Sequence, residues 1–389
     1  MAYLEEAFCL IRNGASIKQF DGASGLPITR IETISDKTIN REKMGYANIA
    51  DDGKYDDYLL QDGDILMSHI NSEKHLGKVA LYHKENDEKI IHGMNLLVLR
   101  PNNEILPLFA YYYFSSQKFK NQIINITKKS VNQASFTVTA LKNLPIELPE
   151  IEEQKSISSV LSKIDSTVNL HEQQLIDLDL LIKSRFIEMF GAFPDNPKGW
   201  ECCTIRDIVK EVRYGSSRPA VEGGKYPYLR MNNITYEGTL DLSEIKYIDV
   251  PEKELEKCTV RKGDVLFNRT NSKELVGKTC LYDRDESMVL AGFIIRVRVN
   301  DKVVPEFLVA FLNMDFSKKM LFNKCKAAIG QANINAQELQ DIEIYLPPLA
   351  LQKEFVSLKY QVDKSKLAVQ QSLNELETLK KSLMQQYFG

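Results

Sequence analysis

One long internal repeat constrains this chain more than any other feature of its 389 residues. The segment Gly63–Ser72 returns as Gly263–Ser272, with Gly-Asp, a short apolar run and Asn-Ser in both copies. Later matches keep an offset of 198 residues and pair Pro107 with Pro305, Gln133 with Gln331, Leu148 with Leu346, Gln154 with Gln352, and Phe190 with Phe388. One register held over so many positions predicts two similarly folded copies in tandem.

The first part of each copy alternates short apolar runs with turn residues. Ile65–Met67 and Val265–Phe267 are such runs, and Gly, Asn and Asp separate them from their neighbours. Leu108–Asn121 and Glu306–Lys319 each follow a proline directly, which favours a helix start. The pattern predicts an α+β domain with a small mixed sheet and a few helices.

The second part of each copy predicts one long helix. Neither proline nor glycine interrupts the chain between Pro149 and Gly191, or between Pro348 and Gly389. Apolar residues recur every seven positions, as in a coiled-coil seam, at Leu161, Val168, Leu175 and Ile182 and again at Val362, Val369, Leu376 and Leu383. Two antiparallel helices of this kind, each roughly 50 Å long at ~1.5 Å per residue, would form a rigid spacer with pseudo-two-fold symmetry.

These patterns divide the chain into a first domain at 1–150, a first helix at 151–191, a second domain at 192–347 and a second helix at 348–389. Two similar domains on a rigid spacer suit a ligand with two sites at a fixed spacing. Duplex DNA is such a ligand, since half-sites one turn apart lie ~34–36 Å from each other. Because the copies are not identical, we expect them to read different sequences in an asymmetric, interrupted target.

Composition leaves DNA binding undecided. The net charge of −3 is not the basic footprint usual for a nucleic-acid-binding domain, so a DNA-contacting face would be a local patch. The six cysteines form no Cys-x-x-Cys pair, and we expect reduced thiols. No apolar run reaches the ~20 residues of a membrane helix, and the N-terminus lacks a secretory pattern. We therefore expect a cytoplasmic protein without membrane contact.

Motifs for enzymatic chemistry are absent from the sequence. Gly277-Lys278-Thr279 is similar to the end of a phosphate-binding loop, but Ser272 stands where its first glycine belongs. The Asn/Asp-Pro-Pro-aromatic tetrad of adenine methyltransferases does not occur. Four histidines between residues 69 and 92 have no histidine counterparts in the second copy, so we expect no metal site.

The duplicated order of motifs resembles the specificity subunits of type I restriction-modification systems. The residues that carry the resemblance are the Gly-Asp elements at 63–66 and 263–269, the segment 196–200 that opens the second copy, and the segments 148–155 and 346–353 that lead into the helices. The resemblance covers nearly the whole chain. No single motif decides it, but their duplicated order does.

The resemblance implies two target-recognition domains separated by two long antiparallel coiled-coil helices, with no catalytic chemistry in this chain. It also implies double-stranded DNA, two methyltransferase subunits that methylate adenine at N6, and two ATP-driven motor–nuclease subunits as partners. S-adenosylmethionine, ATP and magnesium would be bound by those partners. Two alternatives stay open at this stage. One is the recognition subunit of a related system whose partner fuses methyltransferase and nuclease, and the other is a duplicated protein-binding scaffold.

Comparison of the two copies suggests which residues contact DNA. In the resembled family an arginine usually follows the Gly-Asp strand, which Arg269 matches and His69 does not. Arg pairs with guanine and Asn or Gln with adenine, so the base-reading candidates are the loop residues Glu32, His69, Gln133, Asn232, Asn268, Arg269 and Gln331. Candidates for phosphate or scaffold contacts are Arg30, Arg230, Lys78, Lys278, Lys128, Lys129, Lys324 and Lys326.

Overall fold

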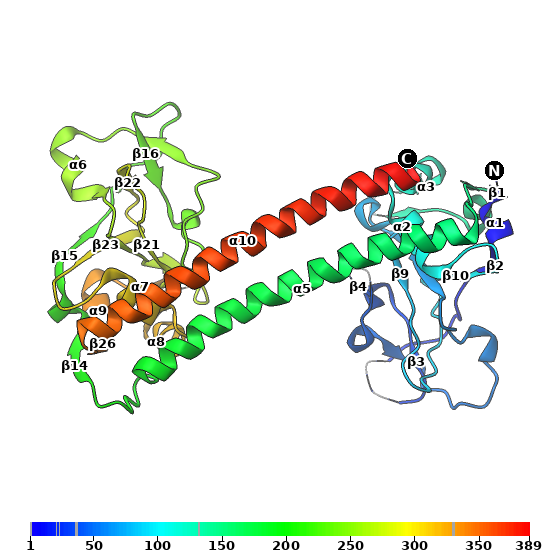
Figure 1. Cartoon of the computed structure of the whole chain (residues 1–389), viewed down its shortest axis with the longest axis horizontal. Coiled ribbons are helices and arrows are strands. Elements are labelled where there is room, and N and C mark those ends of the chain that lie inside the picture. Colours follow the sequence, from blue (N-terminus) through cyan, green and yellow to red (C-terminus); the bar gives the residue numbers. More distant parts are fainter. Residues whose placement is uncertain (1, 21, 23, 36–37, 131–132, 329–330) are drawn as a thin grey trace. The chain divides into compact units, whose positions relative to one another are not determined.

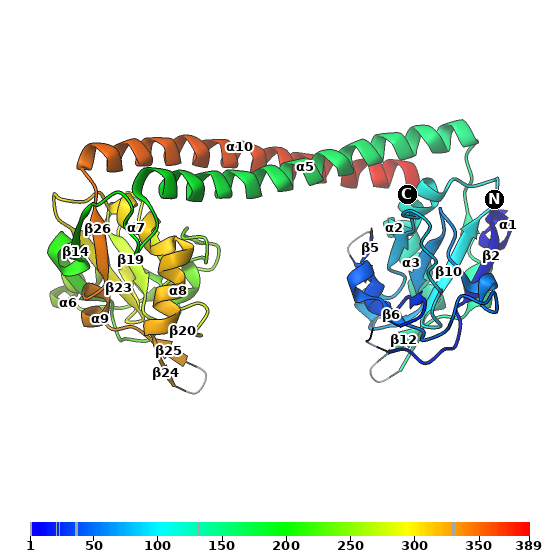
Figure 2. The same ribbon diagram turned by 90° about the horizontal axis from the view of Figure 1, so that it is seen from below.

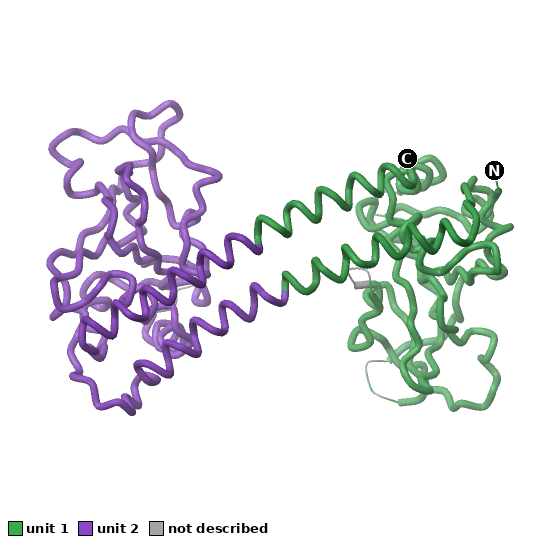
Figure 3. Tube along the Cα trace, in the orientation of Figure 1, with its two compact units in different colours: residues 1–172, 370–389 green, residues 173–369 purple. Residues whose placement is uncertain are grey.

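The computed structural model describes residues 2–20, 22, 24–35, 38–130, 133–328 and 331–389 (Figure 1). The chain divides into two compact units (Figure 3), in which unit 1 comprises Met1–Glu172 and Gln370–Gly389, and unit 2 comprises Gln173–Val369. The long helices α5 (Ile151–Phe190) and α10 (Leu349–Phe388) each begin in one unit and end in the other. Each unit therefore contains the sheet domain of one copy and a segment of both helices.

The elements of unit 1 that precede α5 are short. In chain order they are β1 (Ala2–Tyr3), α1 (Leu4–Ala7), β2 (Phe8–Asn13), β3 (Pro27–Ile28), η1 (Ile31–Thr33), β4 (Ile34–Ser35), β5 (Thr38–Ile39), η2 (Arg41–Lys43), β6 (Gly45–Tyr46), η3 (Asp56–Tyr58), β7 (Ile65–Ser68), β8 (Ile70–Asn71), η4 (Glu73–His75), β9 (Val79–Leu81), β10 (Leu96–Pro101), α2 (Pro107–Ser115), α3 (Gln117–Ile126), β11 (Lys128–Lys129), β12 (Ala134–Ser135), α4 (Val138–Lys142) and β13 (Pro145–Ile146). Helix α2 begins at a proline, whose fixed φ suits the first helical position.

Unit 2 has a similar, though not identical, order of elements between the two long helices. Its elements are β14 (Glu201–Thr204), η5 (Ile205–Ile208), β15 (Val209–Tyr214), β16 (Tyr226–Leu229), η6 (Met231–Asn233), β17 (Lys246–Ile248), α6 (Glu252–Cys258), β18 (Thr259–Val260), β19 (Val265–Asn268), β20 (Thr270–Asn271), β21 (Thr279–Leu281), β22 (Met288–Leu290), β23 (Ile294–Val299), α7 (Pro305–Asn313), α8 (Asp315–Lys324), β24 (Lys326–Ala328), β25 (Gln331–Asn333), α9 (Ala336–Gln340) and β26 (Glu343–Leu346). Like α2, helix α7 begins at a proline.

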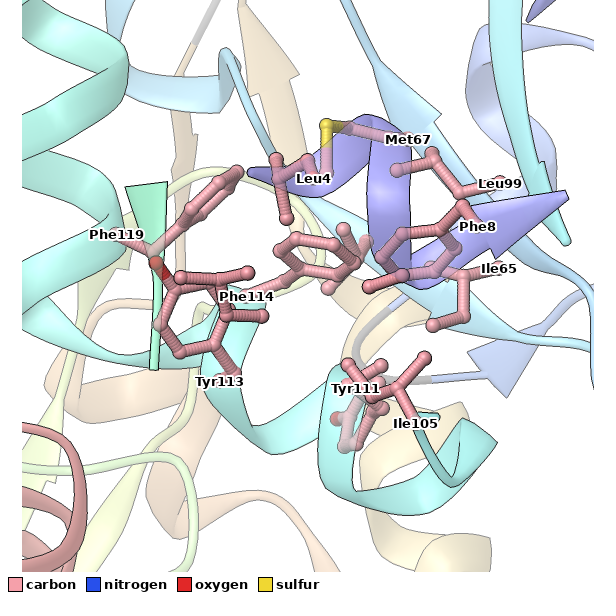
Figure 4. Close-up of a cluster of buried hydrophobic side chains, with 14 of the residues drawn as sticks. Leu4, Phe8, Ile65, Met67, Leu99, Ile105, Tyr111, Tyr113, Phe114 and Phe119 are labelled. Carbon is pink, nitrogen blue, oxygen red and sulfur yellow. The ribbon is translucent and has the colours of Figure 1, made fainter. Parts of the chain in front are cut away.

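A four-stranded antiparallel sheet, in the order β2-β10-β7-β9, forms the centre of unit 1. Ile65, Met67 and Leu99 point to a core that α1, α2 and α3 share (Figure 4), whereas Leu66 and Val98 point to a second, smaller core. Both faces of the sheet are buried, and side chains alternate between the faces along each strand. This explains why the strands are unbroken apolar runs in the sequence.

The central sheet of unit 2 has the same topology, in the order β15-β23-β19-β21. Its register is also the same, since Phe267 lies opposite Ile295 as Met67 lies opposite Leu97. A further sheet, β17-β16-β22-β18, contains the parallel pair β16 and β22 among antiparallel neighbours. The predicted fold class is confirmed: two similar α+β domains with small mixed sheets, together with two long helices.

The Gly-Asp element shared by the copies is part of the scaffold. Gly63 has φ +85°, a conformation that favours glycine, at the turn before β7. The Asp64 carboxylate is buried and accepts hydrogen bonds from Nε and Nη2 of Arg100, both at 2.8 Å. Asp264 and Arg298 repeat this pair before β19, with a Nε to Oδ1 distance of 2.8 Å. The element thus fixes where each central strand begins, and with it the loop at the end of the strand.

A buried glutamine in the first turn of each long helix ties the helix to the domain that precedes it. Gln154 Oε1 accepts from the Leu106 N–H, and Gln154 Nε2 donates to the carbonyls of Glu104 and Pro149, all at 2.9 Å. Gln352 makes the equivalent three hydrogen bonds in unit 2. A buried side-chain amide whose hydrogen bonds are all made anchors the helix, which accounts for the glutamine that the two copies share.

The heptad pattern corresponds to paired segments of α5 and α10. In unit 1, Leu161, Val168 and Leu373 are buried, and Lys380 forms an ion pair with Asp165 between the two helices. An ion pair also joins the helix segments in unit 2. The seam is therefore partly apolar and partly charged.

The end of each long helix packs into the core of the other copy's domain. Phe388, from the second copy, is buried in unit 1, with its ring centroid 5.4 Å from Phe109 and 6.1 Å from Tyr113. Phe190, from the first copy, is buried in unit 2, 4.9 Å from Phe307. Sequence order groups each helix with the domain before it, whereas packing places its last turns in the core of the other copy's domain.

Candidate nucleic-acid interface

In each unit the loop after the Gly-Asp strand runs into a small ribbon at the end of the unit away from its helix segments (Figure 2). In unit 1 the ribbon has the order β11-β12-β8, and in unit 2 the order β20-β25-β24. The loops at this end carry most of the predicted base-contacting residues. A set of loops on a rigid sheet is the usual location of binding residues.

Arg269 is held by its backbone on both sides. Its N–H donates to the Phe293 carbonyl (3.0 Å), and its carbonyl accepts from the Ile334 N–H (2.9 Å). The guanidinium lies over the ring of Tyr214, 4.9 Å from the centroid, and the Tyr214 hydroxyl accepts from the Ala336 N–H (2.8 Å). Within the described residues, Arg269 Nε has no hydrogen-bond partner. The side chain is partly exposed and fixed against an aromatic face, as a base-reading arginine requires.

His69, at the same backbone position in unit 1, is a packing residue. It is only 5% exposed, and its ring packs edge-on against Phe136 with centroids 6.4 Å apart. Burial lowers the pKa of His69 below its ordinary value, so the ring is neutral at pH 7. A side chain so enclosed cannot reach a base edge without leaving the core. The burial of His69 is therefore inconsistent with its predicted contact to a base.

Three other predicted base contacts lie where a duplex can reach them. Glu32 in η1, Asn232 in the equivalent turn η6, and Gln133 before β12 are all exposed. The side chains of Gln331 and Lys326 lie outside the described part of the chain, although their backbones belong to the ribbon of unit 2.

The structure does not support the base contact that the sequence comparison predicted for Asn268. It is fully buried at the end of β19, where its Oδ1 accepts from the Thr270 N–H (3.3 Å). Its Nδ2 has no partner among the atoms that the structure describes. Since the side chain has no exposed surface, Asn268 supports the loop rather than reading a base.

Arg30 and Arg230, which both copies share, differ in their surroundings. Arg30 Nε donates to Gln19 Oε1 (2.8 Å) and its Nη2 to the Phe20 carbonyl (3.2 Å). A Cβ at Gly45 would lie 2.4 Å from Arg30 Nε, so the guanidinium fills the space that this glycine leaves. Arg30 is therefore scaffold. Arg230 has a buried Nε that is unpaired within the described chain. Its side chain as a whole is partly exposed, so it stays a candidate for contact with DNA.

The predicted phosphate-contacting lysines of unit 1 lie at the same end as its ribbon. Lys128 and Lys129 form β11 and are exposed, and Lys129 Nζ lies 2.7 Å from Glu73 Oε1. Lys78 is half-buried beside β9. In unit 2, Lys324 is exposed at the end of α8. Exposed ion pairs such as that of Lys129 are weak, so a phosphate can compete with Glu73 for this lysine.

Lys278 is a second correction, because its ammonium is buried inside unit 2. Its Nζ donates to the carbonyls of Met231 (3.0 Å) and Ile234, and burial lowers the pKa of Lys278.

We expect Lys278→Met to lower the free energy of unfolding by about 1–3 kcal/mol, since two carbonyls lose their donor. Denaturant titration followed by Trp200 fluorescence measures this. Lys324→Met, at an exposed site, should change stability by less than about 0.5 kcal/mol. Unchanged stability of Lys278→Met with weakened DNA binding would restore the phosphate role.

Tyr214 is the interface residue that the sequence comparison missed. It occupies the place of Asn13, since Tyr214 lies opposite Ile295 as Asn13 lies opposite Leu97. An aromatic-for-polar difference between the aligned copies is therefore the feature that marks it. Unit 1 has a stacked arginine at another position, since the Arg12 guanidinium lies 4.2 Å from the ring centroid of Tyr58. The two units therefore place their stacked arginines at different points of the same fold.

No metal centre is formed by the part of the chain that the structure describes, where no group of three or more His, Cys, Asp or Glu side chains could hold an ion. His69 and His92 are buried, whereas His75 and His83 are exposed, so the four histidines of unit 1 do not form one cluster. Among the described helices, none has the length and apolar character to cross a membrane.

Comparison with known proteins agrees with this architecture. The family described as "Type I restriction modification DNA specificity domain" matches residues 6–179 and again residues 197–378, once in each copy. The chain is 33% identical to the putative type I restriction enzyme MjaX specificity subunit of Methanocaldococcus jannaschii, over 98% of this chain and 90% of that protein. It is 27% identical to the type I restriction enzyme EcoKI specificity subunit of Escherichia coli K12, over 67% of this chain and 59% of that protein.

Solved structures show the same fold at low sequence identity. A chain from the structure titled "Structural basis underlying complex assembly and conformational transition of the type I R-M system" aligns with a TM-score of 0.61 at 19% identity, over 100% of this chain and 96% of that chain. The S subunit of the type I restriction-modification system from M. genitalium aligns with a TM-score of 0.54 at 14% identity, over 98% and 94%. With two family matches over most of its length and a relative 33% identical along 98% of it, the chain belongs to the DNA specificity subunits of type I restriction-modification systems.

Proposed function

We propose that this chain reads a bipartite, asymmetric DNA target, one half with each unit, as the non-catalytic specificity subunit of a type I restriction-modification complex. The observation that carries the proposal is that each copy has its own match to the DNA specificity family, yet differs from the other in its loop residues. Arg269 replaces His69, and Asn232 replaces Glu32, on equivalent backbone. Different donors and acceptors at the same place select different bases, so the two half-sites differ.

The partners are those that the resemblance to type I specificity subunits implies, and the helices and the net charge support them. In unit 2 the apolar side chains Ile176, Leu180, Tyr360 and Leu367 of the paired helices are exposed. Exposed apolar residues on paired helices favour a protein partner. We assign these helices to two methyltransferase subunits that methylate adenine at N6, joined by two motor–nuclease subunits. S-adenosylmethionine, ATP and magnesium are bound by those subunits. With a net charge of −3, this chain needs partners to neutralise most of the DNA phosphates.

The proposal is tested by co-expressing the chain with its neighbouring methyltransferase gene in a host that lacks adenine methylation. Modification-aware sequencing of the host genome should reveal one interrupted, asymmetric motif methylated on both strands. Co-purification of both proteins without methylation of any motif would count against the proposal.

Arg269→Ala should relax base selection in one half of the target only. Loss of a bidentate arginine contact removes ~1–3 kcal/mol of discrimination, which is about a 5- to 150-fold fall in preference at one base pair. The measurement is the methylated fraction of sites that differ by one base from the motif. Arg284→Ala is the matched control, since Arg284 is exposed in unit 2 and pairs with Asp283; it should leave the motif unchanged. Relaxation of both halves together would contradict the assignment.

A further inference from the structure

We infer that Tyr214 is a positioning residue for DNA specificity, which holds the Arg269 guanidinium in the direction needed to bind the O6/N7 edge of a guanine. The inference rests on the proposed function and adds to it a residue and a base. It concerns the second half-site only, because the supporting geometry lies wholly in unit 2.

The surrounding residues hold both the backbone and the guanidinium plane of Arg269 in place. Its backbone is held by Phe293 and Ile334 on either side, so the Cα cannot shift along the loop. Tyr214 supplies a flat surface 4.9 Å from the guanidinium carbon, an attractive cation–π arrangement. That ring is itself anchored, because its hydroxyl accepts from the Ala336 N–H at 2.8 Å. An arginine oriented beforehand in this way loses less conformational freedom when it binds a base.

Both members of the pair reach the surface. Tyr214 is 42% exposed, and Arg269 is partly exposed. None of the ion pairs within the described chain involves Arg269, and its Nε is buried and unpaired there. A guanidinium without a carboxylate partner keeps its terminal Nη donors available for an acceptor from outside the protein. Planar guanidinium groups donate to guanine O6 and N7 together, which is the commonest specific contact in the major groove.

Unit 1 shows what the same backbone does without this tyrosine. Asn13 occupies the place of Tyr214, in the strand position opposite Leu97. The side chain after the strand, His69, then has no ring on the surface side and packs inward against Phe136. His69 ends 5% exposed.

The two units thus differ in which side of the loop carries the aromatic ring, and the residue after the strand turns toward that ring in each case. Where unit 1 has the inner ring of Phe136, unit 2 has Ile334, and both donate their N–H to the carbonyl of the residue after the strand. Where unit 1 has Asn13, unit 2 has the outer ring of Tyr214. A ring on the core side accompanies a buried side chain, and a ring on the solvent side accompanies a partly exposed one. This reciprocal difference points to the tyrosine as the feature that directs Arg269 outward.

The decisive variant is Tyr214→Asn, which gives unit 2 the residue of unit 1. It is co-expressed with the methyltransferase partner, and the methylated fraction is measured at every site one base away from the wild-type motif. We expect preference at one guanine of the second half-site to fall about 3- to 30-fold, the range set by the strength of a cation–π contact. The affected base should be the one that Arg269→Ala relaxes. Tyr214→Phe keeps the ring and should retain preference within about twofold.

Three further variants separate positioning from a structural role. Tyr247→Asn removes another exposed tyrosine of unit 2, 46% exposed, and should leave the motif intact. The double variant Tyr214→Asn with Arg269→Ala should relax the motif no further than Arg269→Ala alone, because one residue acts through the other. If Tyr214→Asn does not accumulate, Tyr214→Leu keeps the apolar bulk without the ring and should give the same relaxation.

Several results would overturn the inference. Unchanged preference in Tyr214→Asn or Tyr214→Leu, relaxation at a base that Arg269 does not read, or a uniform loss of methylation with normal preference would each do so. A wild-type complex that methylates no interrupted motif would instead contradict the proposed function, so the two failures are distinguishable.

Discussion

Replacing Phe388 by alanine should lower the free energy of unfolding of unit 1 by about 3–5 kcal/mol and leave unit 2 nearly unchanged. Phe388 belongs to the second copy, but it is only 5% exposed in the core of unit 1, between the rings of Phe109 and Tyr113. Removal of the ring loses its burial and leaves a cavity among aromatic neighbours that cannot easily move inward. The first domain is therefore stabilised by residues almost three hundred positions away along the chain.

Hydrogen exchange followed by mass spectrometry resolves the two units in one experiment. In Phe388→Ala the amides of β10 and α2 should exchange faster, whereas those of β23 and α7 should not. Phe190→Ala is the mirror variant, because Phe190 is buried in unit 2, and it should have the opposite effect. Leu379→Ala is the matched control on the same helix, since Leu379 is 48% exposed. Destabilisation of unit 2 alone by Phe388→Ala would show that the helix ends pack with the domain of their own copy.

Acidification from pH 7 to pH 5 should destabilise unit 1 by about 2 kcal/mol through His92. His92 is buried, its Nε2 lies 2.9 Å from the Leu96 carbonyl, and its Nδ1 is unpaired within the described residues. Burial, with smaller contributions from Arg12 and His69 that oppose a second positive charge, lowers the pKa of His92 to about 4. The unfolded chain has an ordinary histidine pKa near 6.5.

The direction of the change in stability with pH follows from which state, folded or unfolded, binds the proton more tightly. A lowered folded-state pKa means that the unfolded state takes up the proton first, so the stabilisation is complete above about pH 6.5 and is lost as the pH falls toward 4. His69, whose pKa burial also lowers, adds to the loss in the same direction. Below about pH 4 His92 is protonated in both states and contributes no further change.

His92→Leu is the test, because Leu290 occupies the equivalent position in unit 2 and is buried there. The variant should have a smaller loss of unit 1 stability between pH 7 and pH 5 than the wild type, by about 2 kcal/mol. Denaturant titrations at the two pH values, read by exchange of unit 1 amides, measure the difference. A carbon-13 NMR titration of the histidine rings gives the pKa directly. Equal pH dependence in wild type and variant would contradict the argument.

The candidate site was only partly accessible from the sequence. Comparison of the copies identified Arg269, Asn232 and Glu32, which the structure leaves exposed or partly exposed in the expected loops. The same comparison could not tell these from Asn268 and Lys278, which the structure buries. The sequence does not show whether a polar side chain in a loop points to solvent or toward backbone carbonyls elsewhere in the fold. That distinction depends on neighbours such as Met231, which lies 47 positions from Lys278.

The duplication, the two long helices and the α+β character of each domain could all be predicted from the sequence. These are properties of local pattern: heptad spacing, unbroken apolar strands, proline at helix starts and a glycine at the turn before each central strand. The burial of Phe388 and Phe190 in the core of the other copy's domain could not be predicted in this way, and neither could the position of Arg269 over Tyr214 or of His69 in the interior. Each of these depends on contacts between segments far apart in sequence, where burial and the available partner set the orientation of a side chain.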